Sequence, residues 1–245
     1  MTDKLTLDMR LATVAELVPS GAVFLDVGTD HGYLPARLLL DGKITEAGAS
    51  DINADPLSKA VRTAEKYGVK DRMSFYLSDG LDLVPDLQRY NCISICGMGG
   101  ELIARILSDS EYVRSDGVKL VLQPMSSAEE LSVYLAENGF SITDERIAFA
   151  QGKLYRVIAA VYDGVRRTYT VLEHILGRIN IEKGVSQPYF DMFLLKNILK
   201  YRRVCDGKRM GGIDAAAENE VLGELYRIAE KEGVEFENDA NVNRT

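Results

Sequence analysis

A run of acidic, glycine and histidine residues, DVGTDHG, occupies positions 26–32. An apolar stretch precedes it, and a stretch with helical spacing of apolar residues follows it. Such a turn between a strand and a helix can hold a small ligand, because a strand-end glycine lets the backbone come close and the helix N-terminus offers free N–H groups. Any tight turn of an α/β domain has a similar composition, so ligand binding and plain turn formation are both open at this point.

The spacing within this turn separates two classes of cofactor. Dinucleotide-binding turns follow G-x-G-x-x-G, and the glycines here do not have that spacing. Turns that bind S-adenosylmethionine follow D/E-x-G-x-G-x-G. Asp26, Gly28 and Gly32 fit this template, with Asp30 in the place of the middle glycine. The two aspartates would repel the phosphates of a dinucleotide but attract a sulfonium cation, so the turn favours S-adenosylmethionine.

Two further aspartates follow the next two expected strands. Asp51 closes the second strand, 23 residues after Gly28, where a carboxylate can accept hydrogen bonds from both ribose hydroxyls. Asp79 follows the third strand, where a carboxylate can accept from an adenine amino group. Each of them alone is also typical of a turn or a helix N-cap. With Asp26 they predict a cofactor site at the carboxyl ends of neighbouring strands. This predicted site also includes Thr29, Asp30, His31, Ile52, Asn53 and Gly80.

Small residues end the fourth expected strand, in the sequence Gly97-Met98-Gly99-Gly100. They leave room for a flat ring, so this loop is a candidate floor beside a transferred methyl group. A glycine-rich turn before a helix explains it equally well. The fifth expected strand ends in QPMS, which includes Pro124, at the same rim. Cys92 and Cys96 have the spacing of strand residues on one face, which indicates small core side chains.

The elements that must position these residues follow from periodicity. Residues 1–163 alternate between short β-rich runs and segments with helical spacing, which predicts a mostly parallel sheet with helices on both faces. The expected strands are 22–27, 46–50, 73–77, 91–96, 118–123, 140–149 and 154–162, and the expected helices are 7–18, 33–40, 55–67, 101–107 and 128–138. The short junction between the last two strands predicts a hairpin and an antiparallel final strand at one edge. The predicted fold class is therefore α/β, with a Rossmann-like, mostly parallel sheet in residues 1–163, the domain that carries the turn favouring S-adenosylmethionine.

The alternation stops after residue 163, and residues 164–245 predict a small C-terminal helical domain that contains a helical hairpin. Its expected helices are 171–181, 189–204 and 215–231, with glycine-containing breaks at 184–188 and 207–212 and a polar tail, 235–245, that is expected to fray. Positions 166–209 carry ten basic and four acidic side chains. This stretch, with Arg202 and Arg203, is a candidate contact for nucleic-acid phosphates, and a solvated helix face is the alternative.

Composition narrows the class of protein. The chain has 245 residues, 29 basic and 37 acidic, and a formal net charge of −8, so a sequence-blind binder of polyanions is not expected. Its three cysteines are an odd number, and no apolar run suggests a membrane span or a secretory signal. A cytoplasmic protein with reduced thiols is expected. With two histidines and no clustered cysteines, no metal site is expected.

Three segments together resemble one family. The turn with its continuation DHGYLP (30–35), the GMGG loop (97–100) and LQP (122–124) resemble the bacterial tRNA (adenine-22 N1)-methyltransferases. This is a class I S-adenosylmethionine-dependent methyltransferase group with a C-terminal helical, coiled-coil-like domain. The resemblance covers the sheet domain throughout and the helical domain in architecture. It implies S-adenosylmethionine as the cofactor, tRNA as the partner, and methyl transfer to N1 of adenine 22.

The resemblance also implies roles for individual residues. The expected cofactor contacts are Gly28, Asp51, Asp79 and the loop 97–100. Apart from the resemblance, the residues expected to contact the substrate are Tyr33 in the turn, Pro124 at the rim, and Arg202 and Arg203 in the basic stretch. Asp30 matches the acid in the family's glycine turn and is the expected catalytic residue, since a carboxylate near N1 and N6 would stabilise the positive charge of the methylated adenine. His31 or Tyr33 could hold the base by stacking, after the base has left its own stack in the tRNA.

Other interpretations stay open from the sequence. One is a methyltransferase that acts on a small molecule or a protein. Another is a nucleotide-binding module without catalysis, or a dinucleotide oxidoreductase, although the missing G-x-G-x-x-G spacing argues against the oxidoreductase. For Asp30 itself, a helix N-cap is the alternative to catalysis.

Overall fold

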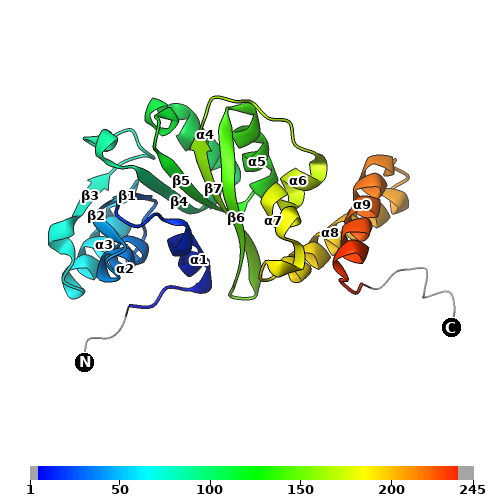
Figure 1. Cartoon of the computed structure of the whole chain (residues 1–245), viewed down its shortest axis with the longest axis horizontal. Helices are drawn as coiled ribbons and strands as arrows, with labels where there is room; N and C mark the ends of the chain where they lie inside the picture. The colour runs from blue at the N-terminus through cyan, green and yellow to red at the C-terminus, as the bar shows by residue number, and fades with distance from the viewer. Residues whose placement is uncertain (1–4, 237–245) are drawn as a thin grey trace. The chain divides into compact units, whose positions relative to one another are not determined.

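The computed structural model of the chain describes residues 5–236 (Figure 1). The chain divides into two compact units, Met1–Thr168 and Tyr169–Thr245. Most of the tail 235–245, for which the sequence predicts fraying, lies outside the described residues. Within the described range, no helix combines the length and the apolar character needed to cross a bilayer.

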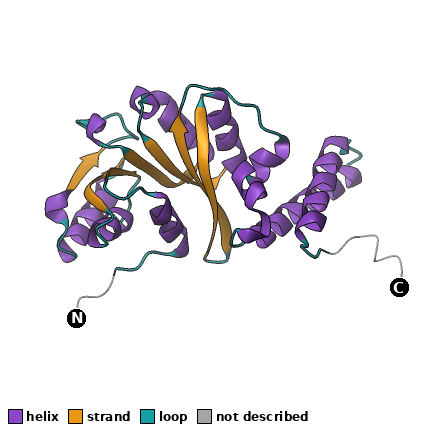
Figure 2. Cartoon of the chain, viewed as in Figure 1, coloured by secondary structure: helices purple, strands orange, loops and turns teal. Residues whose placement is uncertain are grey.

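The first unit is built around a seven-stranded sheet with the strand order β3-β2-β1-β4-β5-β7-β6. Figure 2 shows the strands in orange, with helices in purple around them. The strands are β1 (Ala22–Val27), β2 (Ile44–Asp51), β3 (Met73–Leu77), β4 (Cys92–Gly99), β5 (Lys119–Ser126), β6 (Phe140–Ala150) and β7 (Lys153–Tyr162). The first five strands pair in parallel, and β7 pairs antiparallel with both of its neighbours. This topology confirms the predicted fold class.

The final strand does not form the edge of the sheet, contrary to the sequence prediction. β7 lies between β5 and β6, and β6 is the edge strand. The reason lies in the side chains. Residues 157–160 of β7 are all buried, as in a strand covered on both faces, whereas β6 interrupts its buried positions with exposed and half-buried ones. The more apolar strand therefore takes the inner position.

Helices cover both faces of the sheet. They are α1 (Met9–Leu17), α2 (Tyr33–Leu40), α3 (Ala54–Lys66), α4 (Gly100–Asp109) and α5 (Ala128–Glu137), with short 3-10 turns η1 (Lys70–Arg72), η2 (Leu87–Arg89) and η3 (Glu111–Arg114). α1, α2 and α3 pack along one face, and α4 and α5 pack together on the other (Figure 1). β1 and β4 are neighbours in the sheet. The strands that follow β1 in the chain, β2 and β3, lie on one side of this pair, and β5, which follows β4, lies on the other side. The carboxyl ends of β1 and β4 therefore form the switch point at which open α/β sheets bind ligands.

The second unit is helical. Its elements are α6 (Val171–Leu176), α7 (Arg178–Lys183), the 3-10 turn η4 (Gly184–Ser186), α8 (Phe190–Met210) and α9 (Ala216–Glu232). The expected helix 171–181 is two helices, because Gly177 between them has a φ of 93°. α8 continues through Gly207, where the sequence predicts a break. It packs against α9 and buries Cys205, and this packing outweighs the low helix propensity of glycine.

Candidate functional site

The turn between β1 and α2 uses left-handed backbone at three alternating positions. Gly28, Asp30 and Gly32 have φ angles of 72°, 48° and 66°. Glycine adopts such angles without steric cost, and aspartate is among the few other residues that tolerate them. Asp30 therefore keeps the backbone conformation of the glycine that the template expects, and it adds a carboxylate at that point.

Asp30 is not the cap of α2. The N-cap is Gly32, so the alternative role as a helix cap is wrong. The Asp30 side chain is 69% exposed, and its Oδ1 lies 3.7 Å from Nε2 of His31. The His31 ring stacks on that of Tyr33, with centroids 5.1 Å apart and planes 11° apart. A carboxylate and a flat aromatic surface thus stand side by side, and all three residues line one cavity.

That cavity, which we call the Asp26 cavity, has a volume of about 500 Å³. The predicted residues that line it are Asp26, Gly28, Thr29, Asp30, His31, Tyr33 and Gly97. The structure adds Asp8, Arg10, Leu11, Leu34, Cys96 and Met125. This lining is part polar and part apolar, and its acids outnumber its single arginine.

A second cavity, the Asp51 cavity, has a volume of about 310 Å³. The predicted residues that line it are Gly28, Asp51, Ile52, Asn53, Asp79, Gly80, Gly97 and Met98. Val27, Ser78, Cys96, Leu102, Arg105 and Ile106 complete the lining. Gly28, Cys96 and Gly97 line both cavities, so one elongated ligand with two chemically different ends could occupy them together.

Two carboxylates of the Asp51 cavity have defined surroundings. Asp51 is 9% exposed, and its Oδ1 accepts a hydrogen bond from the backbone N–H of Asn53 at 2.9 Å. Asp79 is half-exposed, and its Oδ1 lies 3.2 Å from Nη2 of Arg105 in α4. Arg105 was not predicted, because the contact joins two segments that are far apart in the sequence. Asp51 and Asp79 can both accept hydrogen bonds from a ligand in this cavity.

Asp26 is the buried acid of the site. Its Oδ1 accepts a hydrogen bond from Oγ of Ser94 at 2.5 Å, and its Oδ2 accepts one from Oγ1 of Thr29 at 2.9 Å. Burial raises the pKa of Asp26 to about 6, although these two hydroxyl groups and the nearby Arg10 act in the opposite direction. The carboxylate is therefore costly to ionise in this place, and a cationic ligand would favour its ionised form.

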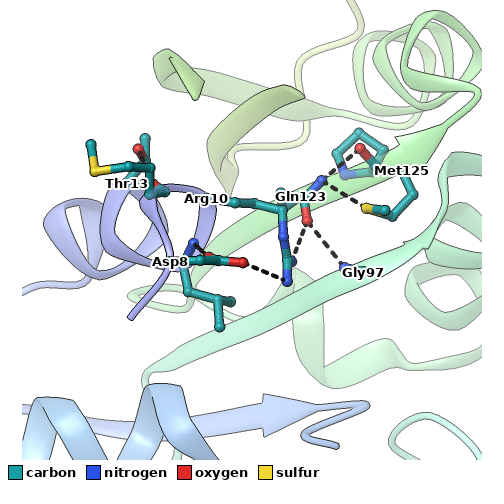
Figure 3. A network of polar contacts seen from close by, with 9 residues as sticks. Asp8, Arg10, Thr13, Gly97, Gln123 and Met125 are labelled. Carbon is teal, nitrogen blue, oxygen red and sulfur yellow. Dashed lines mark hydrogen bonds and ion pairs between the residues drawn. The ribbon is translucent and has the colours of Figure 1, made fainter. Parts of the chain in front are cut away.

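Arg10 and Gln123 were not predicted as site residues, yet they form a polar network at the wall of the Asp26 cavity (Figure 3). Oε1 of the fully buried Gln123 accepts hydrogen bonds from Nη1 of Arg10 at 2.7 Å and from the backbone N–H of Gly97 at 3.3 Å. Nε2 of Gln123 donates to the carbonyl oxygen of Pro124 at 2.7 Å. One signal was available in the sequence, since Arg10 precedes the apolar Val14 by four positions and so lies on the same side of the expected helix.

Some predicted residues do not line either cavity. In the first unit these are Gly99, Gly100 and Pro124. Arg202 and Arg203 belong to α8 of the second unit. Nε of Arg202 donates to the hydroxyl of Tyr226 at 2.5 Å, whereas the Arg203 side chain is exposed. Within residues 5–236, no three His, Cys, Asp or Glu side chains form a group that could hold a metal ion.

Comparison with known proteins identifies the family. A family model described as "Methyltransferase domain" matches residues 7–158. The tRNA (adenine(22)-N(1))-methyltransferase of Bacillus subtilis (strain 168) is 36% identical over 170 residues, which are 66% of this chain and 71% of that protein. The chain belongs to the tRNA (adenine-22 N1)-methyltransferase family.

Solved structures extend this similarity beyond the sheet. The B. subtilis tRNA methyltransferase TrmK is 28% identical, with a TM-score of 0.75, and the match covers 94% of this chain and 98% of that one. Streptococcus pneumoniae Sp1610 in complex with S-adenosyl-L-methionine is 28% identical, with a TM-score of 0.78, and the match covers 90% and 99%. The family resemblance of the three sequence segments is confirmed. This methyltransferase is therefore neither a dinucleotide oxidoreductase nor a module without catalysis.

Proposed function

We propose that this chain transfers the methyl group of S-adenosylmethionine to N1 of adenine 22 in tRNA. One observation carries the proposal. The acids at the carboxyl ends of β1, β2 and β3 line two cavities that share a wall, in a chain that belongs to this methyltransferase family. We assign residues 1–163 to cofactor binding and catalysis and residues 164–245 to tRNA binding. The cytoplasm, where tRNA is found, is the proposed location.

The two cavities suit the two ends of the cofactor. In this proposal the adenosine part occupies the Asp51 cavity, with Asp51 accepting from the ribose hydroxyls and Asp79 from the adenine amino group. The methionine part extends into the Asp26 cavity. The sulfonium then lies near the wall that the cavities share, which Gly28 and Gly97 line. The acidic lining favours a cationic cofactor.

Asp30 and its neighbours would act on the incoming adenine. N1 is a neutral nucleophile that attacks the methyl carbon, and the product carries a positive charge that spreads to the exocyclic amine. An ionised Asp30 beside the base stabilises this charge and can accept a proton afterwards. The stacked rings of His31 and Tyr33 offer a flat surface on which the flipped base can rest.

A methylation assay tests the proposal. Two transcripts of one tRNA, with adenine or guanine at position 22, are incubated with the protein and S-adenosylmethionine, and the nucleosides are then analysed. We expect 1-methyladenosine only from the transcript with adenine 22. Methylation of both transcripts would contradict the assigned position. Methylation of neither, with transfer to a small molecule or a protein in a cell extract, would favour the alternative substrate classes.

The pH dependence of cofactor binding tests the role of Asp26. The cationic cofactor should favour the carboxylate form, so its affinity should rise as the pH increases through the pKa of about 6. We expect the Kd of S-adenosylmethionine to be about tenfold higher at pH 5 than at pH 7. Arg10 from α1 and Asp51 from β2 are the charged groups that act on Asp26. Titration calorimetry across this range should show the change in the native protein and a flat profile in Asp26→Asn. A slope that persists in the variant would show that a group other than Asp26 causes it.

Phosphate contacts of the second unit are proposed for one face of α8. Lys196, Lys200 and Arg203 are exposed, and their spacing places them on the same side of this helix. Replacing Arg203 with glutamine should weaken tRNA binding and lower the slope of log K against log salt by about 1. The matched control is Arg209→Gln, since Nη1 of Arg209 already lies 3.2 Å from Oδ1 of Asp206. Equal salt slopes for the native protein and the Arg203 variant would argue against this face.

A further inference from the structure

The Asp26 cavity has a mixed charge that the proposed position of the cofactor explains only in part. Asp8, Asp26 and Asp30 are its acids, and Arg10 is its one arginine. The acids suit the sulfonium and ammonium groups of S-adenosylmethionine. The methionine part of that molecule also carries a carboxylate, which needs a cation or several N–H donors in a site that is partly closed to water.

Gln123 and Asp8 hold the Arg10 guanidinium at the cavity wall. Nη1 of Arg10 donates to Oε1 of Gln123, and Nη2 lies 3.7 Å from Oδ2 of Asp8 (Figure 3). The Arg10 side chain is 20% exposed, so most of its aliphatic stem is covered while it lines the cavity. Arginine has five N–H donors in a fixed plane, and the hydrogen bond to Gln123 uses one of them.

Gln123 fixes the direction of this guanidinium. Its amide is fully buried, and its Oε1 accepts from both Arg10 and the backbone of Gly97, while its Nε2 donates to Pro124. The amide can satisfy these partners in only one of its two orientations, since the oxygen accepts and the nitrogen donates. One buried side chain of β5 thus links the first turn of α1 to the glycine loop at the end of β4.

We propose that Arg10 binds the carboxylate of the methionine part of S-adenosylmethionine, and that Gln123 positions Arg10 for this contact. The inference rests on the proposed function, because it takes S-adenosylmethionine as the ligand of the two cavities. It assigns a binding role to α1, which precedes the first strand. In this arrangement Arg10 recognises one end of the cofactor, Asp51 and Asp79 recognise the other, and the sulfonium is fixed between them.

Two ligands that differ only in the carboxylate provide the test. Calorimetry measures the Kd of S-adenosylmethionine and of decarboxylated S-adenosylmethionine for the native protein and for Arg10→Gln. We expect the native protein to prefer the carboxylate-bearing ligand by about 10- to 100-fold, the usual range for a charge-assisted hydrogen bond. The variant should lose most of this preference and bind the decarboxylated ligand as the native protein does. That unchanged affinity also shows that the variant is folded.

Two further variants sharpen the interpretation. Gln123→Leu should reduce the preference for the carboxylate-bearing ligand while Arg10 is still present, which a loss of general stability would not do. Arg37→Gln is the matched control. Arg37 donates to the carbonyl oxygen of Leu5 in the same N-terminal segment, but it lines neither the Asp26 nor the Asp51 cavity. We expect it to keep the native preference.

The possible outcomes separate the inference from the proposed function. If Arg10→Gln keeps the native preference, the carboxylate is bound elsewhere and the inference is wrong. If the native protein does not distinguish the two ligands, the inference is wrong as well, although both still bind. If the native protein binds neither ligand, the proposed function fails first.

Discussion

Replacing Asp30 with asparagine is expected to lower kcat for tRNA methylation by about 100- to 10,000-fold, the range over which a positioned acid or base contributes to catalysis. The Kd of S-adenosylmethionine should change little. The physical reason is that the charge on adenine develops only during methyl transfer, so the carboxylate of Asp30 acts on the transition state and the product more than on the bound cofactor.

The local structure makes asparagine the suitable replacement. Position 30 has a φ of 48°, a left-handed conformation that asparagine and aspartate both tolerate and that alanine adopts only with strain. The Asp30 side chain is largely exposed, so the change removes a charge without leaving a hole in the core. Asp30→Ala should lose a similar amount of activity and in addition some stability.

Asp86→Asn is the matched control for this experiment. Asp86 also has left-handed backbone, with a φ of 52°, but it precedes η2 and lines neither the Asp26 nor the Asp51 cavity. Its replacement should leave kcat and Kd as they are. Stopped-flow or quenched single-turnover methylation at saturating cofactor measures the chemical step directly. An Asp30→Asn enzyme with native turnover would exclude the catalytic role.

Much of the candidate site could be predicted because it follows from topology. Asp26, Asp51 and Asp79 come at the ends of consecutive strands, and the ends of parallel strands meet at one rim of a sheet. The alternation of apolar runs and helical spacing was enough to place them there. The chemistry of acids at such a rim, and the failed dinucleotide spacing, then pointed to a cationic cofactor.

Contacts between distant segments could not be predicted in the same way. Arg10 and Gln123 are 113 positions apart, and periodicity does not show that α1 reaches the end of β5. The ion pair between Asp79 and Arg105 likewise joins two segments whose contact periodicity does not show. The order of the last two strands was also missed, because a hairpin can dock through either strand, and only the packing of residues 157–160 against both layers decides between them.

Gly100 shows why a glycine in a site motif need not touch the ligand. The predicted role for the whole loop 97–100 is a cofactor contact, but Gly100 lines neither cavity. A Cβ at this position would lie 1.9 Å from the carbonyl oxygen of Ser127 and 3.1 Å from Cβ of Leu131. α4 and α5 can therefore approach each other at this point only if residue 100 has no side chain.

Gly100→Ala is accordingly expected to destabilise the fold by about 3 kcal/mol, the upper part of the usual range for overpacking. The nearest atom belongs to the backbone, so a rotamer change cannot remove the clash, and the start of α4 must shift. For a chain of this size the loss corresponds to a fall in Tm of about 6–12 °C. Thermal unfolding of the protein without ligand measures it.

Gly99→Ala is the control next to it in the sequence. Gly99 has an ordinary φ of −67°, and a Cβ there would meet only Oγ of Ser126, at 3.3 Å, a group that can rotate away. Its Tm should stay within about 3 °C of the native value, since such a glycine-to-alanine change costs less than about 1 kcal/mol or even stabilises. Similar Tm values for the two variants would show that α4 shifts without cost, and the glycine at position 100 would then need a functional explanation after all.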